Sequence, residues 1–174
     1  LSLGESYEKL DTPAYASVYG SRRKSLDWSN TLALDNGTAA FGVNASKESG
    51  YSNGWSGPEF KETRDNHGVF GVWNSSFGRQ SLELASRWVD NSLFGSRLTS
   101  SAAWVLQVSP EGRLRASWGH GFRAPNFNEL YYPGFFGSFG GNPDLDPERS
   151  QSLEVGYSHV FSSMLRAELS DHRS

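Results

Sequence analysis

The sequence has no cysteine, one methionine and only a small excess of negative charge in its 174 residues. The lack of cysteine excludes disulfide scaffolds, cysteine-ligated zinc or iron–sulfur sites, and a cysteine nucleophile. A formal net charge of −3 argues against a protein that wraps nucleic acid or adheres to anionic lipid by charge alone. No stretch approaches the roughly 18 consecutive apolar residues that a membrane-spanning helix needs. The length allows one domain, or part of a larger one.

Aromatic residues and glycine, in contrast, are plentiful. The chain is 14% aromatic and contains 19 glycines, although its mean hydropathy is only −0.56. Such a mean is typical of soluble proteins, but a membrane β-barrel is apolar only at every second residue and gives the same average. Composition therefore leaves both classes open.

Alternation of apolar and polar residues recurs along the chain and predicts strands. In the first clear example, Leu26 and Trp28 lie on one face while Asp27 and Ser29 lie on the other. Similar patterns begin near residues 38, 81, 97, 113 and 151, and weaker ones cover 1–8, 66–77 and 164–174. No apolar run has helical spacing. We therefore expect an all-β protein with roughly nine strands.

The connections between these strands alternate in length. Short turns are expected near residues 35–37, 78–79, 109–112 and 162–163, and long loops over 9–22, 52–65, 90–96 and 124–150. Short turns on one rim and long loops on the other are typical of an antiparallel up-and-down transmembrane β-barrel. The polar faces are rich in small neutral residues, as a water-filled lumen would be. A soluble carbohydrate-binding β-sandwich and a small passive or structural outer-membrane barrel of eight strands remain alternatives.

Two neighbouring motifs add a more specific indication. Residues 119–131 read GHGFRAPNFNELY, and residues 141–150 read GNPDLDPERS. Pro125 and Pro143 cannot donate to a sheet ladder and so end strands, while Asn142 and Asp146 favour turns. Together the motifs resemble a signature region of TonB-dependent outer-membrane receptors. Residues 64–70 and 87–95 are similar to the segments that precede it in the cobalamin receptor subgroup.

This resemblance implies that residues 1–174 are an internal part of a receptor barrel. Plugged outer-membrane transporters have about 22 strands, so we expect the plug domain and the C-terminal strands to lie outside this sequence. The resemblance also implies a place in the bacterial outer membrane and uptake of cobalamin or a related corrinoid. Uptake would be energised by TonB, acting through the plug. A ferric siderophore or haem receptor is the alternative within the family.

Candidate ligand-binding residues cluster where the long loop leaves its strand. Arg123 and Asn126 supply polar rim groups, and aromatic side chains follow among glycines. A large amphipathic ligand is held by aromatic faces together with a few hydrogen bonds. The aromatic candidates are Tyr131, Tyr132, Phe135 and Phe136, with Phe139 in the same loop.

Catalytic and metal-binding patterns are weak, so no catalytic residue, cofactor or metal site is predicted. The four histidines are scattered, and His120 and His159 fall on the apolar faces of their strands. Asp144, Asp146 and Glu148 lack the glycine and the distal glutamate of a calcium-binding EF-hand loop, which favours a turn.

The remaining surface residues suggest contacts with the membrane. The basic run at residues 22–24 is expected at the barrel rim, near lipopolysaccharide phosphates, and no nucleic-acid partner is expected. An aromatic belt at the lipid–water boundary is expected from outward-facing side chains. These are Trp28, Trp88, Trp104, Trp118 and Phe122.

Overall fold

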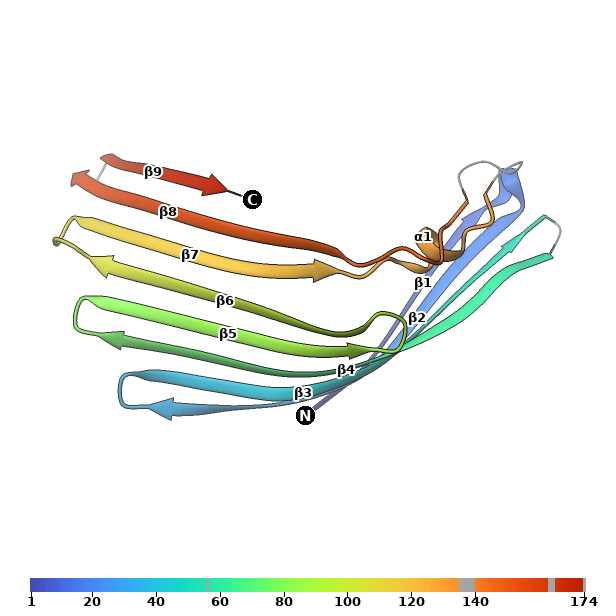
Figure 1. Cartoon of the computed structure of the whole chain (residues 1–174), viewed down its shortest axis with the longest axis horizontal. Helices are drawn as coiled ribbons and strands as arrows, with labels where there is room; N and C mark the ends of the chain where they lie inside the picture. The colour runs from blue at the N-terminus through green and yellow to red at the C-terminus, as the bar shows by residue number, and fades with distance from the viewer. Residues whose placement is uncertain (56, 135–139, 163–164, 174) are drawn as a thin grey trace.

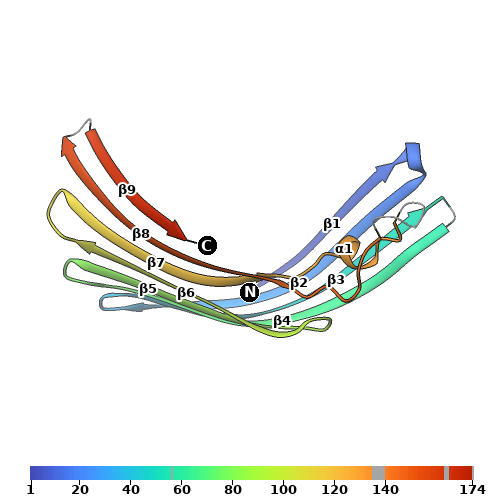
Figure 2. The ribbon, with the colours of Figure 1, turned by 45° about the horizontal axis from the view of Figure 1, so that its top comes forward.

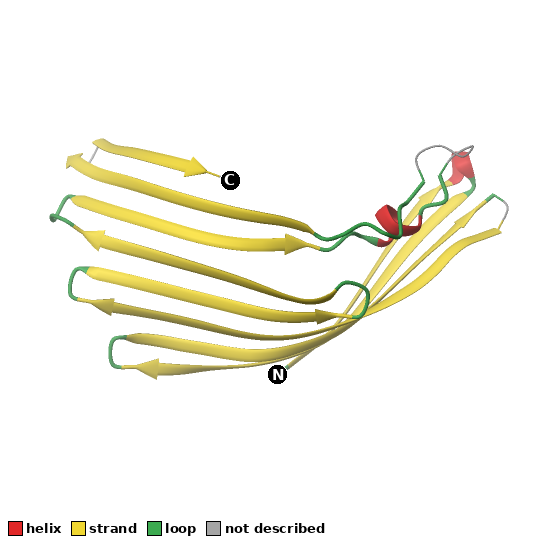
Figure 3. Cartoon of the chain, viewed as in Figure 1, coloured by secondary structure: helices red, strands yellow, loops and turns green. Residues whose placement is uncertain are grey.

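The computed structural model describes residues 1–55, 57–134, 140–162 and 165–173. Nine strands form one antiparallel sheet in which each strand pairs with the next in sequence (Figures 1 and 3). They are β1 (Ser2–Thr12), β2 (Ser17–Leu34), β3 (Gly37–Gly54), β4 (Gly57–Phe77), β5 (Gln80–Asn91), β6 (Gly95–Gln107), β7 (Gly112–Arg123), β8 (Glu148–Ser162) and β9 (Leu165–Arg173). A short 3-10 turn, η1 (Pro13–Tyr15), joins β1 to β2, and one helix, α1 (Phe127–Tyr131), follows β7.

The sheet is curved into a trough. Figure 2 shows β1 and β9 as the raised edges, with α1 on the concave side. Within the described ranges, no helix has the length and apolarity to cross a membrane. The predicted all-β class and the number of strands are confirmed. Because the strands form a single sheet, the two-sheet core of a β-sandwich is not present in the described part of the chain.

The strand register places the predicted tryptophans on one face. Directly paired residues share a face of a sheet, and one such ladder runs across β2 to β6. It consists of Trp28, Val43, Val69, Trp88 and Leu98. The same face carries Trp104, Trp118 and Phe122. Leu84 of this face pairs with Ala102, and Ala102 pairs with Trp118. Trp104 and Phe122 lie an even number of residues from Ala102 and Trp118 on the same strands, so they point to the same side. This face is the convex one, opposite α1, and the prediction that it carries the tryptophans is confirmed.

The apolar residues of the convex face have no protein layer over them. Among the described residues, only Phe60, Phe127 and Leu130 are buried hydrophobic side chains, and they lie where α1 meets the concave wall. Leucine, valine and tryptophan side chains of the convex face are largely exposed. An apolar surface of this extent requires an apolar environment, such as lipid, to cover it.

Three predicted long loops are wrong. Of residues 90–96, only 92–94 lie outside the paired strands β5 and β6, so this connection is a short turn. Residues 9–22 and 52–65 continue the strands as paired extensions, leaving only η1 and a tight connection near Gly54 and Gly57 as links. These extensions carry few apolar residues, and the aromatic ones, such as Tyr19 and Phe60, lie on the concave face, so their sequence shows no regular alternation although the backbone pairing persists. As a result β2, β3 and β4 are 18 to 21 residues long and project beyond the apolar band. The helix α1 was also not predicted.

Candidate functional site

The connection between β7 and β8 folds back over the concave wall. It begins with α1, whose start is fixed by a reciprocal capping box. The Asn126 side chain accepts a hydrogen bond from the Glu129 backbone N–H (2.9 Å), and the Glu129 carboxylate accepts one from the Asn126 N–H (2.7 Å). This pairing satisfies two backbone donors that a helix start otherwise leaves free. It therefore stabilises a helix of only five residues.

Arg123 closes the base of this connection. Its guanidinium donates to Glu129 (3.0 Å) and to Glu148 (2.8 Å), and so joins the end of β7, the start of α1 and the start of β8. The hydrogen bonds that Arg123 donates to Glu148 and Glu129 raise the pKa of Arg123. In return, Arg123 lowers the pKa of the Glu148 carboxyl. Arg123 is therefore the centre of an ion-pair clamp that joins β7, α1 and β8.

Arg64, on β4, anchors the same segment to the wall. Its side chain donates to the Pro125 carbonyl (2.7 Å) and to the Glu48 carboxylate (2.5 Å). Its guanidinium also lies 5.0 Å from the centre of the Phe127 ring, a cation–π geometry. Two interactions from one side chain thus hold the α1 segment, while the third fixes that side chain to the wall.

Aromatic rings fill the space between α1 and the wall. The Tyr131 ring lies 6.0 Å from Phe60 of β4 and 6.5 Å from Phe127, and Phe60 lies 6.4 Å from Tyr19 of β2. Burial raises the pKa of the Tyr19 phenol, with a smaller contribution from Glu8. Gly50 of β3 leaves room for Phe127, because a Cβ at this position would overlap the Phe127 ring. Tyr131 therefore packs against the wall.

The returning segment, from Gly140 onward, packs beside α1. The Asn142 N–H donates to the Glu129 carbonyl (2.8 Å), and its side chain accepts from the Asp144 N–H (3.0 Å), which forms the predicted turn. A Cβ on Gly141 would come within 2.6 Å of the Leu130 backbone, so the close approach requires glycine. Leu130 beneath it is the most buried large side chain described, at 1% exposure.

A hollow of about 440 Å³ lies on this connection. It is lined by amide, carboxylate, phenol and glycine groups, which combine hydrogen-bonding capacity with an aromatic surface. The lining residues are Asn126, Asn128, Glu129, Tyr132, Gly140 and Gly141. We refer to it as the outer hollow.

The predicted site residues do not all lie at the outer hollow. Asn126 and Tyr132 line the outer hollow, whereas Arg123 forms the clamp below it and Tyr131 faces the wall. Phe135 and Phe136 lie outside the described residues, as does Phe139. Asn128 and Glu129 were not singled out from the sequence. The spacing of Asn126 and Glu129 is itself a capping-box signal that could have located α1 and these residues.

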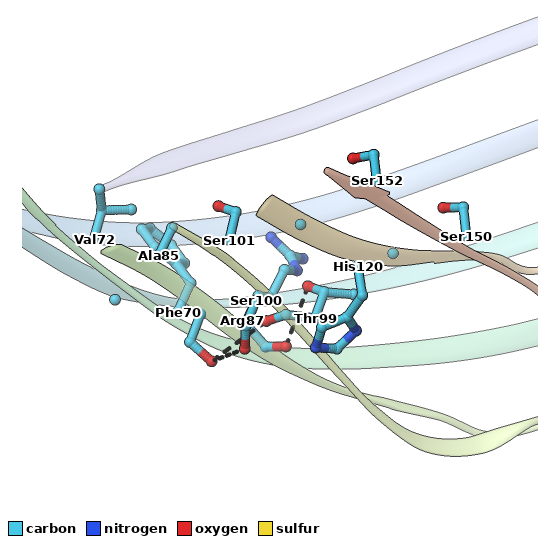
Figure 4. Close-up of a pocket in the computed structure, with 14 residues that line it drawn as sticks. Phe70, Val72, Ala85, Arg87, Thr99, Ser100, Ser101, His120, Ser150 and Ser152 are labelled. Carbon is cyan, nitrogen blue, oxygen red and sulfur yellow. Dashed lines mark hydrogen bonds between the residues drawn. The ribbon is translucent and has the colours of Figure 1, made fainter. Parts of the chain in front are cut away.

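A second hollow, of about 490 Å³, lies on the concave wall nearer the other rim (Figure 4). Its lining is dominated by small residues, among them Ser101, Ser150 and Ser152. Figure 4 shows His120 directed to the opposite side of the sheet from these serines. His120 lies beside Trp118, with ring centres 5.4 Å apart, which agrees with its predicted place on the apolar face.

The concave wall carries more charge than the sequence analysis predicted. The basic run at residues 22–24 does not act as one patch, because consecutive strand residues point to opposite faces. Arg22 pairs with Glu5 on the convex side (2.5 Å), whereas Arg23 pairs with Glu48 on the concave side (3.1 Å). In the described ranges, no group of three His, Cys, Asp or Glu side chains is arranged to hold a metal ion.

Comparisons with known proteins agree with this architecture. The chain is 33% identical over 143 residues to the vitamin B12 transporter BtuB of Vibrio cholerae, covering 82% of this chain and 22% of that transporter. The siderophore receptor PirA of Pseudomonas aeruginosa superimposes with a TM-score of 0.69 at 21% identity, over 90% of this chain and 31% of that one. The copper transporter OprC superimposes with a TM-score of 0.70 at 19% identity, over 91% of this chain and 30% of that one. These two structures share the fold.

The matched proteins are thus described as transporters and receptors, and this chain spans about a fifth of the length of BtuB. A family model described as "TonB dependent receptor-like, beta-barrel" matches residues 3–170, almost the whole sequence. The chain therefore belongs to the TonB-dependent receptor β-barrel family.

Proposed function

We propose that this chain is part of the wall and outer mouth of an outer-membrane receptor that takes up cobalamin or a related corrinoid. The observation that supports this most is the outer hollow, held over the trough by the Arg123 clamp and the Arg64 anchor. The cargo class comes from the 33% identity to a vitamin B12 transporter. Uptake would be energised by TonB acting through a plug inside the complete barrel.

In this proposal the chain forms no covalent bond with the solute and catalyses no reaction. Asn126, Asn128 and Glu129 offer amide and carboxylate groups to the amide-rich rim of a corrinoid, and Tyr132 offers a ring to its flat face. The convex tryptophans would meet lipid, as an aromatic belt does. Residues 1–174 would then form about nine neighbouring strands of a larger closed barrel.

The test is equilibrium binding of cyanocobalamin to the intact receptor in detergent, comparing Tyr132→Ala with Tyr157→Ala. The two tyrosines are matched in exposure, at 38% and 41%, but Tyr157 lies on the convex face of β8. Loss of one stacked aromatic side chain, worth about 1.5–3 kcal/mol, corresponds to at least about tenfold weaker binding. We expect this loss for Tyr132→Ala alone.

Two results would contradict the proposal. Equal affinity of the two variants would remove the outer hollow from the binding site. Binding of a ferric siderophore by the intact receptor, with no measurable affinity for cyanocobalamin, would replace the cargo by the alternative within the family.

A further inference from the structure

A third hollow, of about 360 Å³, lies on the concave wall between α1 and the serine-lined hollow of Figure 4. We call it the inner hollow. It shares Arg87 and Thr99 with the hollow of Figure 4, and it includes Arg64, which anchors α1. Its other lining residues come from β2, β3, β4, β5 and β7 and from the residue after β7, so no short stretch of sequence encodes it. They are Arg23, Asn44, Ser46, Glu48, Asn66, Val89, Asn91, Phe122 and Ala124.

The charges lining the inner hollow do not balance. Three guanidinium groups face one carboxylate, that of Glu48, which binds both Arg23 (3.1 Å) and Arg64 (2.5 Å). Arg87 donates instead to the neutral Asn44 side-chain oxygen (2.9 Å). Among the described residues, no carboxylate pairs with Arg87. The inner hollow therefore has an excess of positive charge centred on this residue.

The hollow also contains a buried hydroxyl group without a partner. Ser46 is 7% exposed, and its Oγ atom makes no hydrogen bond to any part of the chain that the structure describes. A buried polar group without a partner is costly, and such groups in native proteins usually have a bound partner. The neighbouring amides, in contrast, satisfy each other: Asn91 donates to the Asn66 side-chain oxygen (2.6 Å).

We propose that the inner hollow binds an oxyanion, specifically a phosphate group of the transported solute. Guanidinium, hydroxyl and amide donors on one concave surface are the groups that recognise phosphate oxygens. Arg87 supplies the uncompensated charge, while Ser46 and Thr99 supply hydroxyl donors. The site lies beyond α1 as seen from the outer hollow, so it would receive the solute after capture. This inference rests on the proposed uptake function, because the solute must enter the barrel.

The first experiment measures phosphate binding directly. The intact receptor in detergent is unfolded by heat in pyrophosphate and in chloride at equal ionic strength, as wild type and as Arg87→Gln, Ser46→Ala and Arg113→Gln. Arg113 is the matched control because it lies on the concave face, donates to the amide of Gln107 (3.3 Å) and lies near the opposite rim. A ligand that binds only the folded state raises the unfolding temperature. We expect this rise in wild type and Arg113→Gln, and its loss in the other two variants.

No rise in wild type, or an equal rise in all four proteins, overturns the proposal. The Ser46→Ala variant keeps the test decisive if Arg87→Gln does not fold, because it removes only one oxygen atom.

The second experiment tests whether the bound oxyanion is the phosphate group of the transported solute. Cyanocobalamin carries a phosphodiester, whereas cobinamide is a corrinoid without it. We expect Arg87→Gln to weaken cyanocobalamin binding about tenfold and to leave cobinamide binding unchanged. Equal weakening of both overturns the assignment to the solute's phosphate. If wild type binds neither corrinoid but still shows the pyrophosphate effect, the proposed cargo is wrong while the oxyanion site stands.

Discussion

Replacing Arg64 by leucine should release α1 from the concave wall without unfolding the sheet. The Arg64 side chain is only 14% exposed and donates to the carbonyl of Pro125, a buried residue. Leaving a buried acceptor without a partner costs about 1–3 kcal/mol, and loss of the cation–π contact with Phe127 adds about 0.5–1 kcal/mol. Glu48 keeps its bond to Arg23, so no buried carboxylate is left unpaired.

The expected destabilisation of the α1 segment is thus about 1.5–4 kcal/mol, which corresponds to at least roughly tenfold and at most roughly 1000-fold faster local opening. Hydrogen exchange of the intact receptor measures this opening at the backbone amides of Leu130, Tyr132 and Asn142, all hydrogen-bonded within the connection. The control is Arg22→Leu, which removes an arginine from an exposed ion pair on the convex face.

Unchanged exchange of these three amides in Arg64→Leu would refute the anchoring role. Equally faster exchange in the strands β5 and β6 would also refute it, because the effect would then be a loss of global stability.

Further consequences follow for the α1 connection and the convex face. Asn126→Ala removes the cap of α1 and should cost about 1 kcal/mol, seen as roughly fivefold faster exchange in the connection. Because Arg123 lowers the pKa of Glu148 below its ordinary value of 4.5, the clamp is fully formed above that pH. It should open as the pH falls through the lowered pKa, which a spin label on the connection would report as increased mobility. Gly141→Ala should displace the returning segment, since the backbone it meets cannot yield, and limited proteolysis should cut there faster. Brominated lipid should quench Trp28 fluorescence in the reconstituted receptor, and unaltered fluorescence would contradict a lipid-facing convex surface.

The strands that cross the apolar band could be predicted from sequence because one of their faces must be apolar. Trp28, Trp88 and Trp118 alternate with small or polar neighbours, and the register places all three on the convex face. Where β2, β3 and β4 extend beyond that band, the convex face becomes polar, apolar residues such as Phe60 are few and lie on the concave face, and the regular alternation disappears. Backbone pairing and cross-strand contacts such as the Arg23–Glu48 ion pair maintain those extensions, and neither gives a periodic signal in a single sequence.

Only the part of the candidate site that lies within one contiguous stretch of sequence could be predicted. The motif around Arg123 and Asn126 points to the β7–β8 connection, and the Asn126–Glu129 spacing encodes α1 directly. The partners of Arg123 and Tyr131, however, depend on which residues the register brings opposite them. The inner hollow illustrates this limit most clearly, because Ser46 and Arg87 belong to strands β3 and β5 and come together only through β4.

The most direct test of the account is uptake of radiolabelled cyanocobalamin by cells in which the intact receptor is the only candidate cobalamin receptor. We expect saturable uptake that disappears when TonB is deleted, while binding to the cell surface remains. Absence of uptake in cells that display the folded receptor, or uptake that persists without TonB, would contradict the proposed function.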